Sequence, residues 1–211
     1  MSAPAALTEA LRLVVILDEG VAGDRDLAAL AVHAARGGAT MLQVRAKAAA
    51  ARDAAELTRR VMAATPLPVV VNDRLDVALA TGAAGCHLGQ DDFPIDAARL
   101  IAPAGFWLGG SAGTADEARR AAAAGAHYLG IGPIATTASK ADAGAAIGVE
   151  GFRRVHAAAP DVPAVAIGGV TPALVPALVS AGARGVAVIR AVLDAGDPEA
   201  ATRTLREAVE R

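Results

Sequence analysis

The stretch from 164 to 190 reads AVAIGGVTPALVPALVSAGARGVAVIR, and it contains a complete strand-helix-strand unit. AVAIGG (164–169) and GVAVI (185–189) are short apolar runs rich in β-branched residues, as expected of buried parallel strands. The segment between them has helical composition, with Thr171-Pro172 as its start signal. Gly182-Ala183 stands where the helix gives way to the second strand, and glycine readily adopts the left-handed conformation that ends a helix. The stretch therefore predicts one βαβ unit.

The same alternation extends back along the whole chain. Gly-Ala pairs recur at Gly38-Ala39, Gly82-Ala83 and Gly125-Ala126, each before a predicted strand. Asp24 and Thr114 precede Ala-rich segments and mark two further helix starts. The predicted strands are LVVIL (13–17), MLQVR (41–45), PVVVN (68–72), CHLG (86–89), FWLGGS (106–111), HYLGIG (127–132), AVAIGG (164–169) and GVAVI (185–189).

Eight strand-helix units in 211 residues indicate an α/β fold, a single closed (β/α)8 TIM barrel. Such barrels usually have about 250 residues, so this one would be compact. An open doubly wound sheet is the alternative, but no Gly-rich dinucleotide fingerprint opens the first helix. We predict one domain over 1–211, with a short N-terminal extension over about 1–12.

Composition narrows the classes of partner. Hydrophobic residues make up 54% of the chain and aromatic residues only 2%, so small and aliphatic side chains must fill the core. Twenty basic and 22 acidic residues give a net charge of -2 with no basic block, which argues against a nucleic-acid partner. One cysteine, Cys86, cannot form an internal disulfide, and neither a signal peptide nor a membrane span is evident. We expect a soluble cytoplasmic protein that does not bind membranes, and Ala-rich helices that are compatible with a homo-oligomer.

Polar residues gather where the predicted strands end, which is the active-site face of a TIM barrel. After the second strand, Gln43, Arg45 and Lys47 fall on one side of an extended chain, where two cations and an amide suit a polyanion. A solvated strand end is the alternative. Asp73 and Asp92 follow the third and fourth strands, which lie about 5 Å apart as neighbours. The two carboxylates could share a hard cation such as Mg²⁺, or each could simply cap the next helix.

Two later segments have the character of anion sites. The connection over 132–144 contains several hydroxyls and Lys140, which suit phosphate oxygens, although a plain surface loop would have the same composition. Gly168-Gly169 and Ile189-Arg190 end the last two strands, where backbone amides customarily bind phosphate in this fold. The sequence therefore offers two separate anion sites.

Taken in order, these motifs resemble the thiamine phosphate synthase family from about Leu13 to Val192. The resemblance rests on QVRAK (43–47), VNDRLDVAL (71–79), HLGQDDFP (87–94), Ser111, GPIATTASK (132–140), AIGGV (166–170) and GVAVI (185–189).

The resemblance implies a transferase that condenses hydroxymethylpyrimidine diphosphate with hydroxyethylthiazole phosphate, giving thiamine phosphate and pyrophosphate. It implies dissociative chemistry, in which the carbon-oxygen bond ionises before the thiazole nitrogen attacks, and a Mg²⁺ cofactor. It also implies catalytic roles for Lys140, Ser111 and Arg45. By position, the diphosphate would be held by Gln43, Arg45, Lys47, Asn72, Thr137, Ser139 and Lys140, its Mg²⁺ by Asp73 and Asp92, and the thiazole phosphate by Gly169, Ile189 and Arg190.

Three positions depart from the family pattern. Ala135-Thr136 stand where the family has Phe-Pro, and Ser139 replaces a threonine. Arg190 replaces a serine. It could either hold the thiazole phosphate or fill the phosphate cup, the anion site formed by backbone amides after the last two strands, and change the substrate.

Two other functions remain as alternatives. A related thiazole tautomerase has a histidine where Pro133 stands, and Pro133 cannot transfer a proton. A non-catalytic barrel that binds a phosphorylated ligand would need the cup but no carboxylate pair. His87 is expected to be a buried histidine bonded to a neighbour, rather than a group near the pyrimidine.

Overall fold

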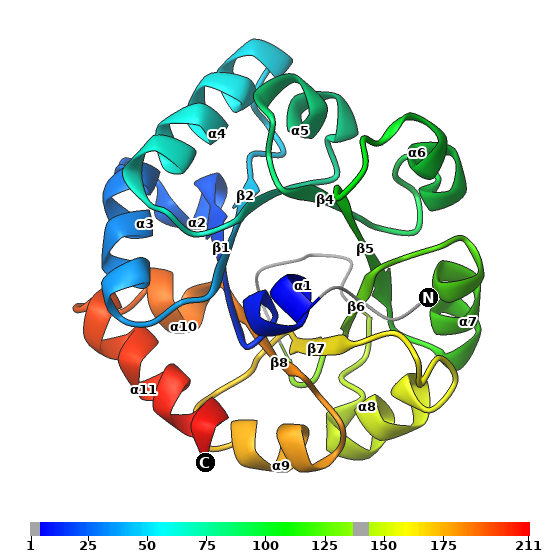
Figure 1. The fold of residues 1–211 in the computed structure, drawn as a ribbon. Coiled ribbons are helices and arrows are strands. Elements are labelled where there is room, and N and C mark those ends of the chain that lie inside the picture. The colour runs from blue at the N-terminus through cyan, green and yellow to red at the C-terminus, as the bar shows by residue number, and fades with distance from the viewer. Residues whose placement is uncertain (1–4, 137–143) are drawn as a thin grey trace.

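The computed structural model describes residues 5–136 and 144–211. Within them, eight parallel strands pair in chain order and β8 pairs with β1, which closes the barrel (Figure 1). The predicted (β/α)8 barrel is therefore confirmed, and the alternative open sheet is wrong. Every predicted strand is present, with ends shifted by at most two residues. The strands are β1 (Leu13–Asp18), β2 (Met41–Arg45), β3 (Val69–Asn72), β4 (Gly85–Leu88), β5 (Trp107–Ala112), β6 (Tyr128–Ile131), β7 (Ala164–Ile167) and β8 (Gly185–Val188).

Helices surround the strands, apart from α1, which lies across one end of the barrel (Figure 1). In the part of the chain that is described, no helix is both long and apolar enough to span a membrane. The helices are α1 (Ala5–Ala10), α2 (Glu19–Ala22), α3 (Leu27–Arg36), α4 (Ala51–Ala64), α5 (Leu75–Thr81), α6 (Ile95–Ile101), α7 (Ala115–Ala123), α8 (Gly148–His156), α9 (Val175–Ser180), α10 (Arg190–Leu193) and α11 (Pro198–Glu210).

The helix ends test the start and stop signals. Thr114 caps α7 in a capping box with Glu117, as its position predicts. The Asp24 prediction is wrong by two residues, because α3 begins after Asp26, whose carboxylate accepts a hydrogen bond from the helix. The Thr171-Pro172 signal is also early, since α9 begins three residues after Pro172. The glycines of all four Gly-Ala pairs have φ between 71° and 102°, so the predicted left-handed helix ends are confirmed.

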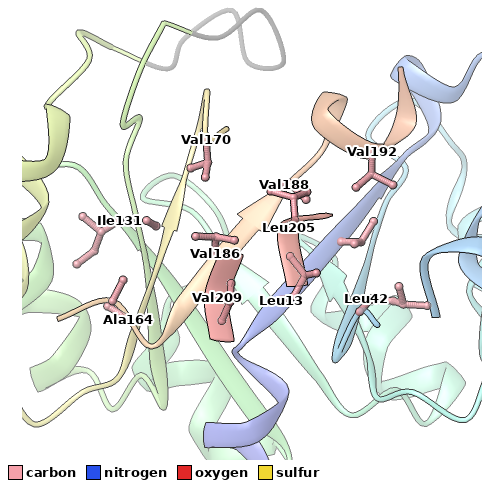
Figure 2. Close-up of a cluster of buried hydrophobic side chains, with 14 of the residues drawn as sticks. Leu13, Leu42, Ile131, Ala164, Val170, Val186, Val188, Val192, Leu205 and Val209 are labelled. Carbon is pink, nitrogen blue, oxygen red and sulfur yellow. The ribbon is translucent and has the colours of Figure 1, made fainter. Parts of the chain in front are cut away.

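The outer face of the strands packs against the helices and forms the larger part of the core. On β8, Val186 and Val188 point outward with a period of two, and on α11 Leu205 and Val209 lie against them (Figure 2). All four side chains are buried. This aliphatic layer fixes the positions of the strands and therefore of the residues that follow them.

The inner face of the strands forms a separate, smaller cluster. On β1, Val14 and Ile16 point into the barrel, whereas their neighbours along the strand pack outward. Leu7 and Leu11, in and just after α1, are fully buried in this inner cluster and close the end of the barrel where the strands begin. The open end lies at the carboxyl ends of the strands, and polar side chains take over the inner face there.

Candidate active site

A cavity of about 1010 Å³ occupies the carboxyl end of the barrel. It brings together residues that follow strands far apart in the sequence, as the fold requires. Thr137, Ser139 and Lys140, which the family resemblance places at the diphosphate, lie outside the described residues. The other predicted site residues all line this cavity, namely Gln43, Arg45, Lys47, Asn72, Asp73, Asp92, Ser111, Gly169, Ile189 and Arg190.

Arg45 is held by a carboxylate that sequence reasoning missed. Its guanidinium forms an ion pair with Asp18, and the two side chains are only 12% and 4% exposed. Asp18 lies opposite Arg45 in the register of β1 and β2, and its other oxygen accepts a hydrogen bond of 3.0 Å from Val21 N at the start of α2. Because Asp18 is fixed by both partners, the arginine at the cavity wall has a defined orientation.

Asp73 and Asp92 meet at the ends of β3 and β4. Burial, and then the neighbouring Asp92 carboxyl, raises the pKa of the Asp73 carboxyl. Lys47 Nζ lies 3.3 Å from Asp73 Oδ2, and Gly89 N donates to Asp92 Oδ2 at 2.6 Å. The alternative that these acids cap helices is wrong, because the N-cap residues of α5 and α6 are Arg74 and Pro94, and neither helix has a side-chain cap bond.

This carboxylate pair has the donor set that suits a hard divalent cation. In residues 5–136 and 144–211, no group of three or more His, Cys, Asp or Glu side chains is placed to hold a metal ion. Two carboxylates completed by water and substrate phosphate oxygens are, however, a usual arrangement for Mg²⁺. Bringing two acids together in a half-buried site is unfavourable unless a cation or a proton compensates. Asp73 and Asp92 therefore fit a Mg²⁺ ion.

Asn72 is the last residue of β3 and directly precedes Asp73. The residue is only 7% exposed, and its Nδ2 atom has no acceptor among the residues that the structure describes. The Nε atom of Arg45 is in the same situation. A buried donor without an acceptor costs about 1–3 kcal/mol, so two such donors beside one cavity fit a site that an anionic ligand completes.

Backbone groups form the wall that faces this polar set. Gly168 and Gly169 follow β7 with φ of 88° and 67°, and Gly168 O accepts a hydrogen bond from Ala135 N at 2.9 Å. Beside them, Ile189 is the N-cap residue of α10. Asn72 ends β3 and Gly168 follows β7, and these strands are four positions apart in the eight-stranded ring, so the two walls face each other across the cavity.

Arg190 lies on the same side of the cavity, in a different setting from the buried Arg45. Its Nη1 atom donates at 2.9 Å to Oδ2 of Asp194, the C-cap residue of α10, and the two side chains are 45% and 46% exposed. An exposed pair of this kind contributes about 0.5 kcal/mol, so a ligand phosphate could compete for the guanidinium.

His87 is buried and hydrogen-bonded, as expected, and it also lines the cavity. Its two ring nitrogens lie within hydrogen-bond distance of Ser111 Oγ, at 3.1 Å, and Tyr128 Oη, at 3.2 Å. Gln90 Nε2 donates to Ser111 O at 2.5 Å. Sequence reasoning missed Gln90 and Tyr128, although HLGQDD (87–92) had drawn attention to the segment that contains Gln90.

Comparison with known proteins places this site in a family. A family model described as thiamine monophosphate synthase matches residues 13–192. The chain is 46% identical over 202 residues to a thiamine-phosphate synthase of Moorella thermoacetica, covering 94% of this chain and 96% of that one. It is 45% identical to one of Methanoculleus marisnigri, covering 93% and 94%.

Solved structures agree with the sequence comparison. A thiamine phosphate pyrophosphorylase of Pyrococcus furiosus is similar with a TM-score of 0.87 and 37% identity, covering 97% of this chain and 98% of that one. A 3-hexulose-6-phosphate synthase at 21% identity and a TM-score of 0.73 shares the fold alone. The family match over most of the chain and the identity to these synthases lead to one conclusion: the chain belongs to the thiamine monophosphate synthase family.

Proposed function

We propose that this protein is a thiamine-phosphate synthase that joins hydroxymethylpyrimidine diphosphate to hydroxyethylthiazole phosphate and releases pyrophosphate. The observation that carries the proposal is the distribution of groups in one cavity, which suits two facing anion sites. Cations and carboxylates lie after β2, β3 and β4, and a backbone cup lies after β7 and β8. A reaction between a diphosphate and a monophosphate needs such a pair of sites.

The diphosphate site would be built from charge that is already oriented. Arg45 is fixed by Asp18, Lys47 reaches the carboxylate pair, and the buried amide of Asn72 offers a donor. Gln43, buried on the same inner face, would contribute an amide. Thr137, Ser139 and Lys140 would add their groups from the connection after β6.

Asp73 and Asp92 would hold the Mg²⁺ ion. When bound, the ion would neutralise charge that develops on the departing pyrophosphate. Lys47, whose Nζ lies 3.3 Å from Asp73 Oδ2, would direct part of its charge at the phosphate oxygens.

This reaction requires stabilisation of the negative charge on the departing diphosphate rather than a general base. The carbon-oxygen bond breaks and its electron pair leaves with the diphosphate, where Arg45, Lys47 and Lys140 would stabilise it. The thiazole nitrogen then forms the carbon-nitrogen bond with its own electron pair. Amides at Gly169 and Ile189 would hold the thiazole phosphate so that this nitrogen faces the cationic carbon.

The nature of the cavity wall favours the synthase over the tautomerase. Pro133 lines the cavity where a tautomerase needs a histidine, and it has no proton to transfer. A barrel that only binds a monophosphate has no use for two neighbouring acids, and burial, followed by the neighbouring Asp92, raises the pKa of Asp73.

The test is incubation of the purified protein with both substrates and Mg²⁺, following thiamine phosphate by mass and pyrophosphate release, with an EDTA control. We expect metal-dependent formation of both products. Asp73→Ala should sharply reduce turnover without full rescue by excess Mg²⁺, and unchanged activity would refute the metal assignment. Absence of both products from folded protein would refute the synthase proposal. Thermal stabilisation by monophosphates alone would then favour the binding module, whereas the synthase predicts Mg²⁺-dependent stabilisation by pyrophosphate.

Arg190 has its own test. Arg190 lines the cavity, and among the described residues its guanidinium pairs with one half-exposed carboxylate, that of Asp194, so we propose that it contacts the thiazole phosphate. Arg190→Ser should therefore change the KM for thiazole phosphate. A change confined to the KM for the pyrimidine diphosphate would contradict the assignment of the two anion sites.

We further propose a single domain over 1–211 and a cytoplasmic location. The barrel spans β1 to β8, and α11 returns to pack on β1, which supports one domain. Cys86 is free and buried, which fits a reducing compartment.

A further inference from the structure

Three polar side chains form a continuous row from the interior of the barrel to the cavity. Tyr128 of β6 is 1% exposed and lies in the inner aliphatic cluster. Its Oη atom is 3.2 Å from Nδ1 of His87 on β4, and His87 Nε2 is 3.1 Å from Ser111 Oγ on β5. His87 and Ser111 line the cavity, whereas Tyr128 lies below it. The row therefore connects a buried phenol to a hydroxyl at the site.

The strands leave room for this row at two glycines. A Cβ atom on Gly109 of β5 would lie 2.3 Å from Tyr128 Cζ and 2.5 Å from His87 Nδ1. A Cβ atom on Gly130 of β6 would lie 3.0 Å from His87 Cε1. Because β4 and β6 are not neighbours in the barrel, the tyrosine and histidine can meet only across β5, where a side chain would separate them.

The row has a defined direction of donation. Burial raises the pKa of Tyr128, so its phenol keeps its hydrogen. Among the described residues, the one hydrogen-bond partner of this phenol is His87 Nδ1, which must therefore act as the acceptor. Nε2 of the neutral ring then carries the hydrogen and donates to Ser111 Oγ. An imidazolium would donate from both nitrogens and leave the buried Tyr128 hydrogen without an acceptor among those residues.

The consequence falls on the hydroxyl of Ser111. Its oxygen receives a hydrogen from His87, so its own hydrogen must point elsewhere. The residue lines the cavity, and none of the described protein groups accepts this hydrogen. The hydroxyl is thus prepared to donate to a ligand.

We propose that Tyr128 and His87 are positioning residues that lock the Ser111 hydroxyl as a donor toward the departing diphosphate. The tautomer and the orientation follow from the hydrogen bonds of the row and from the burial of Tyr128. The identity of the acceptor rests on the proposed function. The lock would act before any substrate binds, and it would stabilise the negative charge on the diphosphate as the carbon-oxygen bond breaks.

The first test is the tautomer of His87 in the wild-type protein without substrate. Nitrogen-15 NMR of labelled histidine distinguishes the two neutral forms, and loss of one of the four histidine signals in His87→Gln assigns it. We expect the Nε2-H form in wild type and a mixture of tautomers in Tyr128→Phe. An Nδ1-H form in wild type would overturn the proposal, and this measurement does not depend on the reaction.

The second test is kinetic and uses the pyrimidine diphosphate, thiazole phosphate and Mg²⁺. Tyr128→Phe keeps the ring and should lower kcat about two- to tenfold, the effect of one hydrogen bond, with the KM for thiazole phosphate unchanged. In a Ser111→Ala background it should have no further effect on kcat, because its effect passes through Ser111. An equal loss in that background would overturn the proposal.

Thr202→Val is the matched control. It removes a fully buried hydroxyl that donates to Pro198 O in α11, away from the cavity, and should lower stability without changing kcat. If the chain makes no thiamine phosphate at all, the synthase proposal fails, while the tautomer measurement still tests the hydrogen-bonded row.

Discussion

Two glycines with nearly the same φ allow the close packing at the proposed phosphate cup, formed by Gly168, Gly169 and Ile189, to be tested. Gly169, in the cup, has φ of 67°, and Gly82, at the end of α5, has φ of 71°. A Cβ atom on Gly82 would meet nothing within 4 Å. A Cβ atom on Gly169 would lie 2.8 Å from both Cβ and O of Ala135. Alanine would take a positive φ at both positions, but of the two only at Gly169 would it also collide with backbone.

The expected magnitudes follow from these two contributions. An L-residue in the left-handed region costs about 1–2 kcal/mol, so Gly82→Ala should lower the free energy of unfolding by about that amount. Overpacking adds about 1–3 kcal/mol, so Gly169→Ala should lower it by about 2–5 kcal/mol. The difference between the two variants isolates the contact between Gly169 and Ala135.

Urea denaturation of both variants measures this difference in the free energy of unfolding directly, provided that the two variants unfold with the same m value. The kinetic assay provides the second readout. Gly169→Ala should raise the KM for thiazole phosphate at least tenfold, as expected from about 1.4 kcal/mol of lost binding, whereas Gly82→Ala should leave it unchanged. Equal destabilisation by the two substitutions would refute the close approach of the two loops, and an unchanged KM would remove Gly169 from the cup.

Three further predictions concern charge and burial. Asp18→Asn keeps the N-cap of α2 but leaves the buried Arg45 guanidinium without its ion pair, so the free energy of unfolding should fall by about 3–5 kcal/mol. Asp26 caps α3 and forms an exposed ion pair, so Asp26→Asn should lower the free energy of unfolding by only about 0–1 kcal/mol. Equal losses for the two variants in urea denaturation would contradict this reasoning. Burial, and then the nearby Arg99, lowers the pKa of His127, whose Nδ1 accepts a hydrogen bond from Leu108 N. The contribution of His127 to the free energy of unfolding is therefore complete above a pH of about 6.5 and is lost as the pH falls through the lowered pKa. Denaturation at pH 8 and pH 5 should show wild type losing stability relative to His127→Gln, and a constant difference would refute the assignment. Burial raises the pKa of Cys86, so a thiol reagent at pH 8 should label it only at the rate of structural opening, which denaturant would accelerate; immediate labelling of native protein would show that the site is accessible.

The strands and the main site groups were predictable because their signals are local. The apolar run of each strand can be recognised in the sequence itself, and a period of two is enough to place Gln43 and Arg45 on the inner face of β2. The start of α3 was misplaced because Asp24 and Asp26 are both good caps, and composition cannot choose between caps two residues apart.

The supporting groups were not predictable in this way because their partners are distant in the sequence. Asp18 and Arg45 are 27 residues apart and meet only through the register of β1 and β2. A prediction of that register, with Asp18 read as the last strand residue, would have found the pair. His87 and Tyr128 are 41 residues apart on strands that are not adjacent, and their contact depends on the missing side chain of Gly109. No periodic pattern reveals such a contact.

Because α1 closes one end of the barrel, it affects how substrates reach the cavity and how products leave it. Since Leu7 and Leu11 fill the floor, the cavity has its mouth at the carboxyl ends of the strands, and every molecule that uses it passes there. In a reaction with two substrates and two products, a single opening means that substrate entry and product release compete with each other. With the diphosphate on the β2–β4 side, as proposed, departing pyrophosphate passes the opening through which the thiazole phosphate enters. The order in which the two substrates bind then influences the rate at which the complex with both of them forms.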